Sequence, residues 1–80
     1  MSVEKIYEAV LDYDDDAVAE LVTAELAAGT DPQKMLDDGL VAALDTVGAQ
    51  FSEGTLFVPE MLMAADAVKA GLDILRPILS

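Results

Sequence analysis

Residues 57–77 read FVPEMLMAADAVKAGLDILRP, and this stretch predicts the last helix of the chain. Pro59 and Glu60 suit a first helical turn, because proline needs no partner for its missing N–H and the helix dipole stabilises a carboxylate there. Apolar residues then recur at the spacing of one helical face, at Met61, Leu62, Ala65, Val68, Leu72, Leu75 and Leu79, until Pro77 weakens the helix. Such a stripe has to be buried against other elements of the fold.

Three earlier segments have the same helical spacing. They predict helices at about Ser2–Asp12, about Asp15–Ala28, and from Pro32 to near Gly54, with a short extended connection from Thr55 to Val58. The third stripe consists of Met35, Leu36, Leu40, Ala43, Leu44, Val47 and Phe51. Tight turns between four such helices predict an all-α fold, an antiparallel four-helix bundle, in a single domain of residues 1–80.

Composition excludes several kinds of chemistry. The 80 residues include no Cys, no His and no Trp, so disulfides, zinc fingers, haem ligation and a His-based triad are excluded. Sixteen acidic and four basic side chains give a formal charge of −12, which disfavours nucleic acid and anionic membranes as partners. We expect no catalytic residue, no metal site, no membrane span and no signal peptide, and therefore a cytoplasmic protein.

Two acidic motifs resemble known sites but lack essential residues. Asp12, Asp14 and Asp16 have the first spacings of an EF-hand, but Ala17 and Thr23 stand where that loop needs Gly and Glu. We interpret these aspartates as the start of the second helix. Asp38-Gly39-Leu40 is the nearest match to the Asp-Ser-Leu of acyl carrier proteins, and it lacks the hydroxyl that would carry the prosthetic group.

Small residues beside the leucine ridge of the last helix have two interpretations. Ala64, Ala67 and Gly71 could admit a broad, flat ligand, or they could pack closely against another helix, which is the commoner case. Gly39 and Gly48, inside the third helix, likewise suggest close approach by a neighbouring helix. Met61 could face either the core or a ligand.

Over nearly its whole length, the chain resembles the helical N-terminal module of corrinoid proteins, the cobalamin-binding cap of methylamine and methanol methyltransferase systems and of methionine synthase. The resemblance rests on Gly39-Leu40, Val47-Gly48, the segment from Phe51 to Gly54, Phe57-Val58-Pro59-Glu60-Met61-Leu62, Ala64-Ala65, Gly71-Leu72, and Leu75 followed by Pro77. The first two helices agree with the family in pattern more than in identity.

This resemblance implies a function as a lid. In that family a four-helix bundle covers the upper face of a corrin held by a following Rossmann-like domain, and it moves aside for a methyltransferase. By position, Phe57 matches the aromatic over the upper axial ligand, Ala64 and Ala67 match positions facing the corrin, and Met61 is a neighbour on the same side. The domain that supplies the axial histidine is absent from these residues, so cobalamin binding would require it.

The resemblance leaves two hypotheses about function. In the first, the chain is the cap of a methyl-carrier protein and works with a corrin-binding domain and a methyltransferase, either as a fragment or as a separate chain. In the second, it is a docking or oligomerisation bundle that binds no cofactor, and an exposed apolar face around Phe57 and Met61 favours a homo-oligomer.

Overall fold

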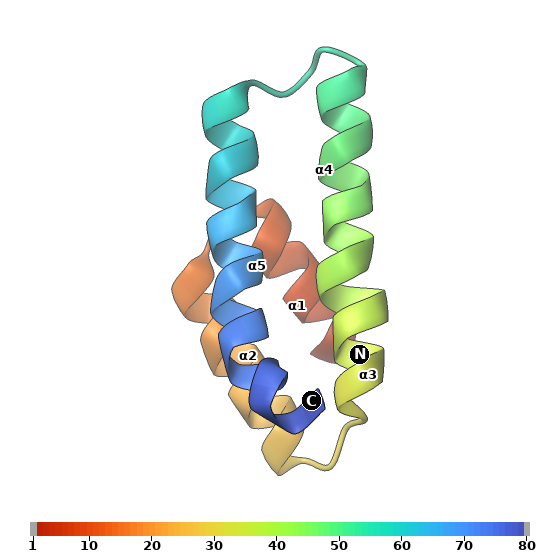
Figure 1. Cartoon of the computed structure of the whole chain (residues 1–80), viewed down its shortest axis with the longest axis vertical. Helices are drawn as coiled ribbons and strands as arrows, with labels where there is room; N and C mark the ends of the chain where they lie inside the picture. The colour runs from red at the N-terminus through yellow and green to blue at the C-terminus, as the bar shows by residue number, and fades with distance from the viewer. Residues whose placement is uncertain (1, 80) are drawn as a thin grey trace.

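The computed structural model describes residues 2–79, and within them every regular element is helical (Figure 1). The elements are α1 (Ser2–Leu11), α2 (Asp15–Ala27), α3 (Pro32–Lys34), the π-helical segment η1 (Met35–Val41), α4 (Ala42–Ser52) and α5 (Val58–Leu79). The prediction of an all-α fold is confirmed. The single predicted helix after Pro32 has three parts, because hydrogen-bond spacing widens in its middle.

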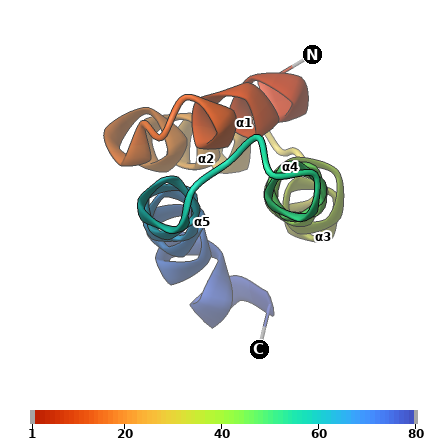
Figure 2. The same ribbon diagram turned by 90° about the horizontal axis from the view of Figure 1, so that it is seen from above.

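Two layers of helices make up the molecule. The α3, η1 and α4 segments follow one another as one rod, and α5 runs back beside α4 (Figure 1). Helices α1 and α2 lie along one side of this pair (Figure 2). The ends of α4 and α5, joined by residues 53–57, extend beyond α1 and α2, so this tip has neighbours on fewer sides.

Aspartates begin two of the helices, and the sequence predicts this for the helix that follows the acidic run. The N–H of Ala17 donates to Asp14 Oδ1 at 3.0 Å at the start of α2, and the N–H of Gln33 donates to Asp31 Oδ1 at 3.0 Å at the start of α3. Each carboxylate satisfies an N–H that the helix leaves without an internal partner. The acidic run after α1 therefore includes a helix cap.

Helices α1, α2 and α4 end in the same way. At each end, one N–H bonds to the carbonyl three residues earlier and the next N–H bonds to the carbonyl five residues earlier. The residue at the turn has a positive φ, which is +88° at Gly29, +80° at Gly54 and +59° at Tyr13. Glycine adopts this conformation freely, whereas a tyrosine there costs about 1 kcal/mol.

The π-helical segment lies where α1 crosses the rod. A Cβ placed on Gly39 would lie 3.2 Å from Ile6 Cγ2 and 3.6 Å from the backbone oxygen of Val3. The predicted close approach of a neighbouring helix at Gly39 is therefore confirmed. On the same side, the hydroxyls of Tyr7 and Thr46 share a hydrogen bond of 2.7 Å that ties α1 to α4.

The buried face of α5 differs from the predicted stripe. Leu62 is 62% exposed and Ala65 is also exposed, so these two assignments to the core are wrong. The α5 residues inside the core are Ala64, Ala67, Val68, Gly71 and Leu75. A Cβ on Gly71 would lie 3.0 Å from Leu40 Cδ1 and 3.1 Å from Val18 Cγ1, so small residues here let α5 approach its neighbours.

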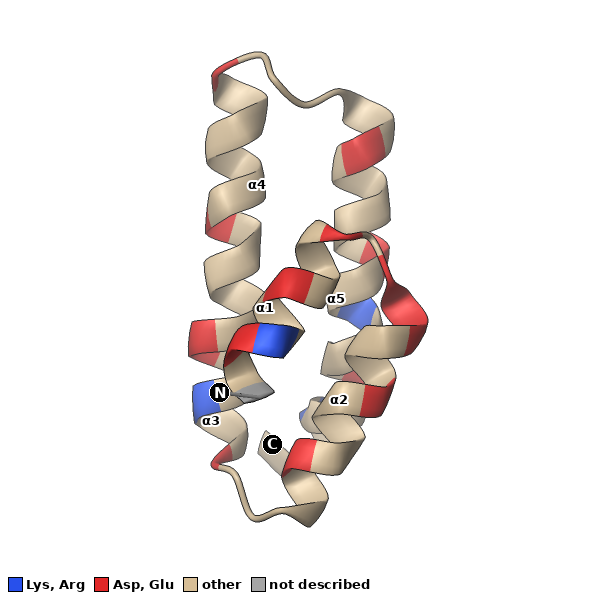
Figure 3. Ribbon diagram, turned by 180° about the vertical axis from the view of Figure 1, so that it is seen from behind, with Lys and Arg blue, Asp and Glu red and all other residues tan. Residues whose placement is uncertain are grey.

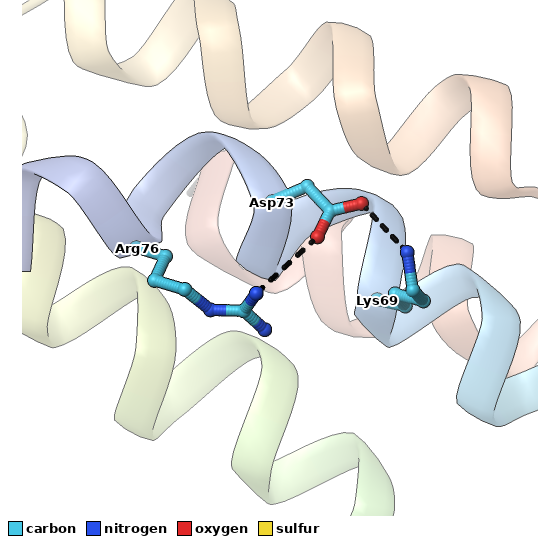
Figure 4. Close-up of polar contacts among 3 residues, drawn as sticks. All are labelled: Lys69, Asp73 and Arg76. Carbon is cyan, nitrogen blue, oxygen red and sulfur yellow. Dashed lines mark hydrogen bonds and ion pairs between the residues drawn. The ribbon is translucent and has the colours of Figure 1, made fainter.

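The exposed surface is strongly acidic. Figure 3 shows acidic residues along α1, α2 and the turn between them, with few basic ones. On α5, Lys69 Nζ lies 3.0 Å from Asp73 Oδ2 and Arg76 lies 3.9 Å from Asp73 Oδ1 (Figure 4). Such exposed pairs add little stability. Within residues 2–79, no helix combines the length and the apolar character needed to cross a membrane.

Candidate functional site

Phe57 lies at the tip of the molecule, immediately before α5. Its side chain is 71% exposed, so packing against the core does not hold it. Its backbone is fixed instead. The carbonyl of Phe57 accepts hydrogen bonds from the N–H groups of Glu60 at 3.0 Å and Met61 at 3.1 Å, which form the first turn of α5. The preceding Leu56 is 7% exposed and anchors the connection in the core.

Glu60 completes the start of α5 from within the helix. Its Oε1 accepts a hydrogen bond of 3.0 Å from the N–H of Phe57. This is the half of a capping box in which an acidic residue reaches back to the residue before the helix. The sequence predicts Glu60 in the first turn for its charge, and the structure adds this specific partner.

Tyr13 approaches Glu60 from the turn between α1 and α2. The Tyr13 hydroxyl points to Glu60 Oε2 at 3.5 Å, across a sequence separation of 47 residues. Burial of the Tyr13 side chain, followed by the negative charge of Glu60 and the hydrogen bond to it, raises the pKa of the Tyr13 hydroxyl above its usual value. The hydroxyl therefore stays protonated and able to donate.

Several apolar side chains of α4 and α5 are exposed in addition to Phe57. On α5, Val58 is 56% exposed and Met63 is 48% exposed, in addition to Leu62. On α4, Phe51 is 42% exposed and Leu44 is 39% exposed, although the sequence predicts both in the core. An apolar surface of this kind, in so acidic a chain, is typical of a region that another molecule covers.

The four residues predicted to bind a cofactor differ in how exposed they are. Phe57 is exposed, Met61 is half-buried and packs against the core, and Ala64 and Ala67 are fully buried. Close packing between helices accounts for the small size of Ala64 and Ala67. Contact of these two residues with a cofactor stays a prediction, and it requires α5 to move relative to its neighbours.

Gly48 lies in α4, the helix that runs beside α5. The space where its Cβ would lie has no neighbouring atom within 4 Å, so no helix among residues 2–79 approaches it. The predicted close approach at Gly48 is wrong for the part of the chain that the structure describes. A mid-helix glycine costs about 1 kcal/mol relative to alanine, and packing inside the chain does not explain it.

Two further features contribute little to a binding site. A pocket of about 260 Å³ lies beside the start of α1 and is lined by Val3, Glu4, Lys34 and Asp38. It is smaller than most ligand pockets and lies apart from Phe57. Within residues 2–79, no group of three acidic side chains converges in a way that would hold a metal ion.

Comparison with known proteins identifies the family. Residues 2–76 match the model of a B12 binding domain. The chain is 41% identical over 75 residues to trimethylamine corrinoid protein 1 of Methanosarcina mazei and 34% identical over 68 residues to the methanol corrinoid protein of Methanosarcina barkeri. These matches cover 94% and 85% of this chain but 35% and 26% of those proteins, so the chain spans about a third or less of their length.

Solved structures show the same fold. The monomethylamine corrinoid protein of Methanosarcina barkeri matches with a TM-score of 0.89 and 27% identity, covering 94% of this chain and 35% of that one. The methanol:cobalamin methyltransferase complex of the same organism matches with a TM-score of 0.84 and 30% identity, covering 95% and 30%. With sequence and fold in agreement over nearly all of its length, the chain belongs to the B12 binding domain family that corrinoid proteins contain.

Proposed function

We propose that this chain is the helical cap of a corrinoid methyl-carrier protein and that the tip around Phe57 covers the upper face of the corrin. The observation that carries the proposal is the exposed Phe57 ring, which is 71% exposed on a backbone that hydrogen bonds hold in place. An aromatic side chain that is exposed while hydrogen bonds hold its backbone is typical of a residue that binds another molecule, and not of a core residue.

The residues present fit the covering part of a corrin site. Phe57, Val58 and Leu62 offer apolar surface at one end of the molecule, and Met61 lies half-buried beside them. A bound corrinoid supplies the organometallic chemistry of methyl transfer. The proposed work of this chain is to exclude water from the reactive face through Phe57 and its apolar neighbours. Cobalt ligation falls to another domain, because the sequence contains neither His nor Cys.

The arrangement of the helices and the partners of the cap are part of the same proposal. We infer that α1, α2, α5 and the rod of α3, η1 and α4 form one antiparallel four-helix bundle. The opposite directions of α4 and α5 and the short turns between helices support this inference (Figure 1). The cap would also take part in methyltransferase docking, since a related chain is found in a methyltransferase complex. Without a covering domain, the exposed apolar tip favours self-association.

A chimera tests the lid directly. Residues 2–79, which include the matched residues 2–76, replace the corresponding segment of the Methanosarcina mazei trimethylamine corrinoid protein 1, which is then loaded with methylcobalamin. We expect Phe57→Ala to speed light-induced loss of the methyl group several-fold, because water and oxygen reach the upper face more easily. Absorption spectra under constant illumination measure the rate.

Ile78→Ala is the matched control. Ile78 is apolar and 50% exposed, but it lies 20 residues after Val58 on α5, or about 30 Å along the helix. We expect its photolysis rate to equal that of the unmodified chimera. Equal rates for Phe57→Ala and Ile78→Ala would contradict the lid assignment.

A further inference from the structure

The turn after α1 contains a tyrosine where two other helices of the chain have glycine. Tyr13 at φ +59° repeats the backbone and hydrogen bonds of Gly29 and Gly54. Among residues 2–79, it is the one non-glycine residue with a positive φ. A residue that keeps an unfavourable conformation usually has a side chain that compensates for it.

The Tyr13 side chain lies against both the core and Glu60. Its ring packs on the hydrophobic core, and its hydroxyl lies 3.5 Å from Glu60 Oε2. The other oxygen of the same carboxylate accepts the 3.0 Å hydrogen bond from the N–H of Phe57. A single carboxylate therefore lies between the α1–α2 turn and the tip.

We propose that Glu60 and Tyr13 are positioning residues for the lid, with Glu60 holding the backbone of Phe57 and Tyr13 limiting the orientations of the Glu60 carboxylate. The inference deepens the proposed function and rests on it for the role of Phe57. The hydrogen bond to Phe57 is the stronger link, because 3.5 Å is near the limit for a hydrogen bond between side chains.

Exposure makes such support necessary. A side chain that is 71% exposed gains little from packing, so the direction of the Phe57 ring depends on its backbone. The Phe57 N–H has a side-chain partner, and the Phe57 carbonyl accepts from α5. Loss of the carboxylate would free the Phe57 N–H, and the carbonyl bonds alone would then hold Phe57 at the start of α5.

Amide exchange in this chain tests the Glu60 contact. Solvent exchange of the Phe57 amide is measured by NMR in the unmodified chain, in Glu60→Ala and in Glu60→Gln. We expect about a tenfold faster exchange in Glu60→Ala, because a hydrogen bond to a charged acceptor is lost. Glu60→Gln keeps an acceptor oxygen and should restore most of the protection. The amides of Val68 and Leu75, in the buried part of α5, should not change.

Tyr13→Phe tests the second positioning residue, since it keeps the ring and the backbone and removes only the hydroxyl. We expect the Phe57 amide to exchange about two- to threefold faster, with the thermal unfolding midpoint unchanged, because the weaker bond is removed. Equal Phe57 exchange in Glu60→Ala and in the unmodified chain would overturn the proposal for Glu60. Equal exchange in Tyr13→Phe would overturn it for Tyr13.

The chimera separates this inference from the proposed function. Glu60→Ala should speed methylcobalamin photolysis as Phe57→Ala does, and Glu60→Gln should leave the rate near that of the unmodified chimera. If Glu60→Ala loosens the Phe57 amide while Phe57→Ala leaves photolysis unchanged, the positioning stands and the lid function is wrong. If Phe57→Ala speeds photolysis while Glu60→Ala changes neither exchange nor photolysis, the lid stands and the positioning is wrong.

Discussion

Gly71 and Gly48 show how differently one residue type serves this chain. Gly71 lies in the core, with Leu40 and Val18 within 3.1 Å of the place a Cβ would occupy. Gly48 has open space at the same place. Close packing between helices explains the first glycine, and no close contact within residues 2–79 explains the second.

A pair of alanine substitutions tests this difference. We expect Gly71→Ala to lower the free energy of unfolding by about 1 kcal/mol, because overpacking of about 1–3 kcal/mol exceeds the helix propensity gained. We expect Gly48→Ala to raise it by up to about 1 kcal/mol through propensity alone. Urea unfolding followed by circular dichroism measures both. Stabilisation by Gly71→Ala would show that Leu40 and Val18 yield easily.

Single residues also mark what the sequence could not predict. The exposure of Phe57 agrees with its expected place on a lid, but the contact between Tyr13 and Glu60 joins residues 47 positions apart, which no local pattern can indicate. The positive φ of Tyr13 is equally hidden, because tyrosine is not a residue expected in a left-handed turn. The signal that could have suggested it is the recurrence of one turn: Tyr13, Gly29 and Gly54 each lie two residues after the last residue of a helix.

Helices as units were predicted well because their periodicity and caps are local. The predicted starts at Ser2, Asp15 and Pro32 agree with the structure, and α5 begins one residue before the predicted Pro59. Its end lies beyond Pro77, which is tolerated in the last turn. The buried face of α5 was predicted in part: Val68 and Leu75 are buried as expected, but Leu62 and Ala65 are not. Alanine and glycine carry little hydropathic signal, so the larger apolar residues dominated the pattern.

The side chain of Asp14 caps α2, and its contribution to stability can be measured. We expect Asp14→Ala to destabilise the fold by about 1 kcal/mol, since the N–H of Ala17 loses its side-chain partner. Asp14→Asn keeps a capping oxygen and removes the charge, so it should be nearly neutral. Thermal unfolding of the two variants distinguishes them. Equal destabilisation by both would assign the effect to charge and not to the cap.

The whole molecule combines an acidic body with an apolar tip. A formal charge of −12 repels other anions at a distance, whereas the surface around Phe57 acts only in contact. The two parts lie on different regions of the fold, because α1 and α2 carry much of the acidic surface and the tip extends beyond them (Figure 3). Charge therefore suits recognition of a partner, and the tip suits the covering of a cofactor.

Docking of a methyltransferase through the acidic face should depend on salt. We expect the association rate of the corrinoid chimera with its methyltransferase to fall as ionic strength rises, because screening removes long-range attraction. Stopped-flow measurements at low and high salt give the rates. Matched rates at both salt concentrations would exclude the acidic face from docking.

The π-helical segment lets the rod of α3, η1 and α4 hold one more residue without turning α4 away from its neighbours. A π-helical turn holds about one residue more than an α-helical turn, so deleting one residue between Met35 and Val41 would let this part of the rod return to α-helical spacing. Val47 would then stay in the core, and α4 would keep nearly the same face toward α1. In a relative with a one-residue gap at this point, we expect an unbroken α-helix and a tip that faces the same direction.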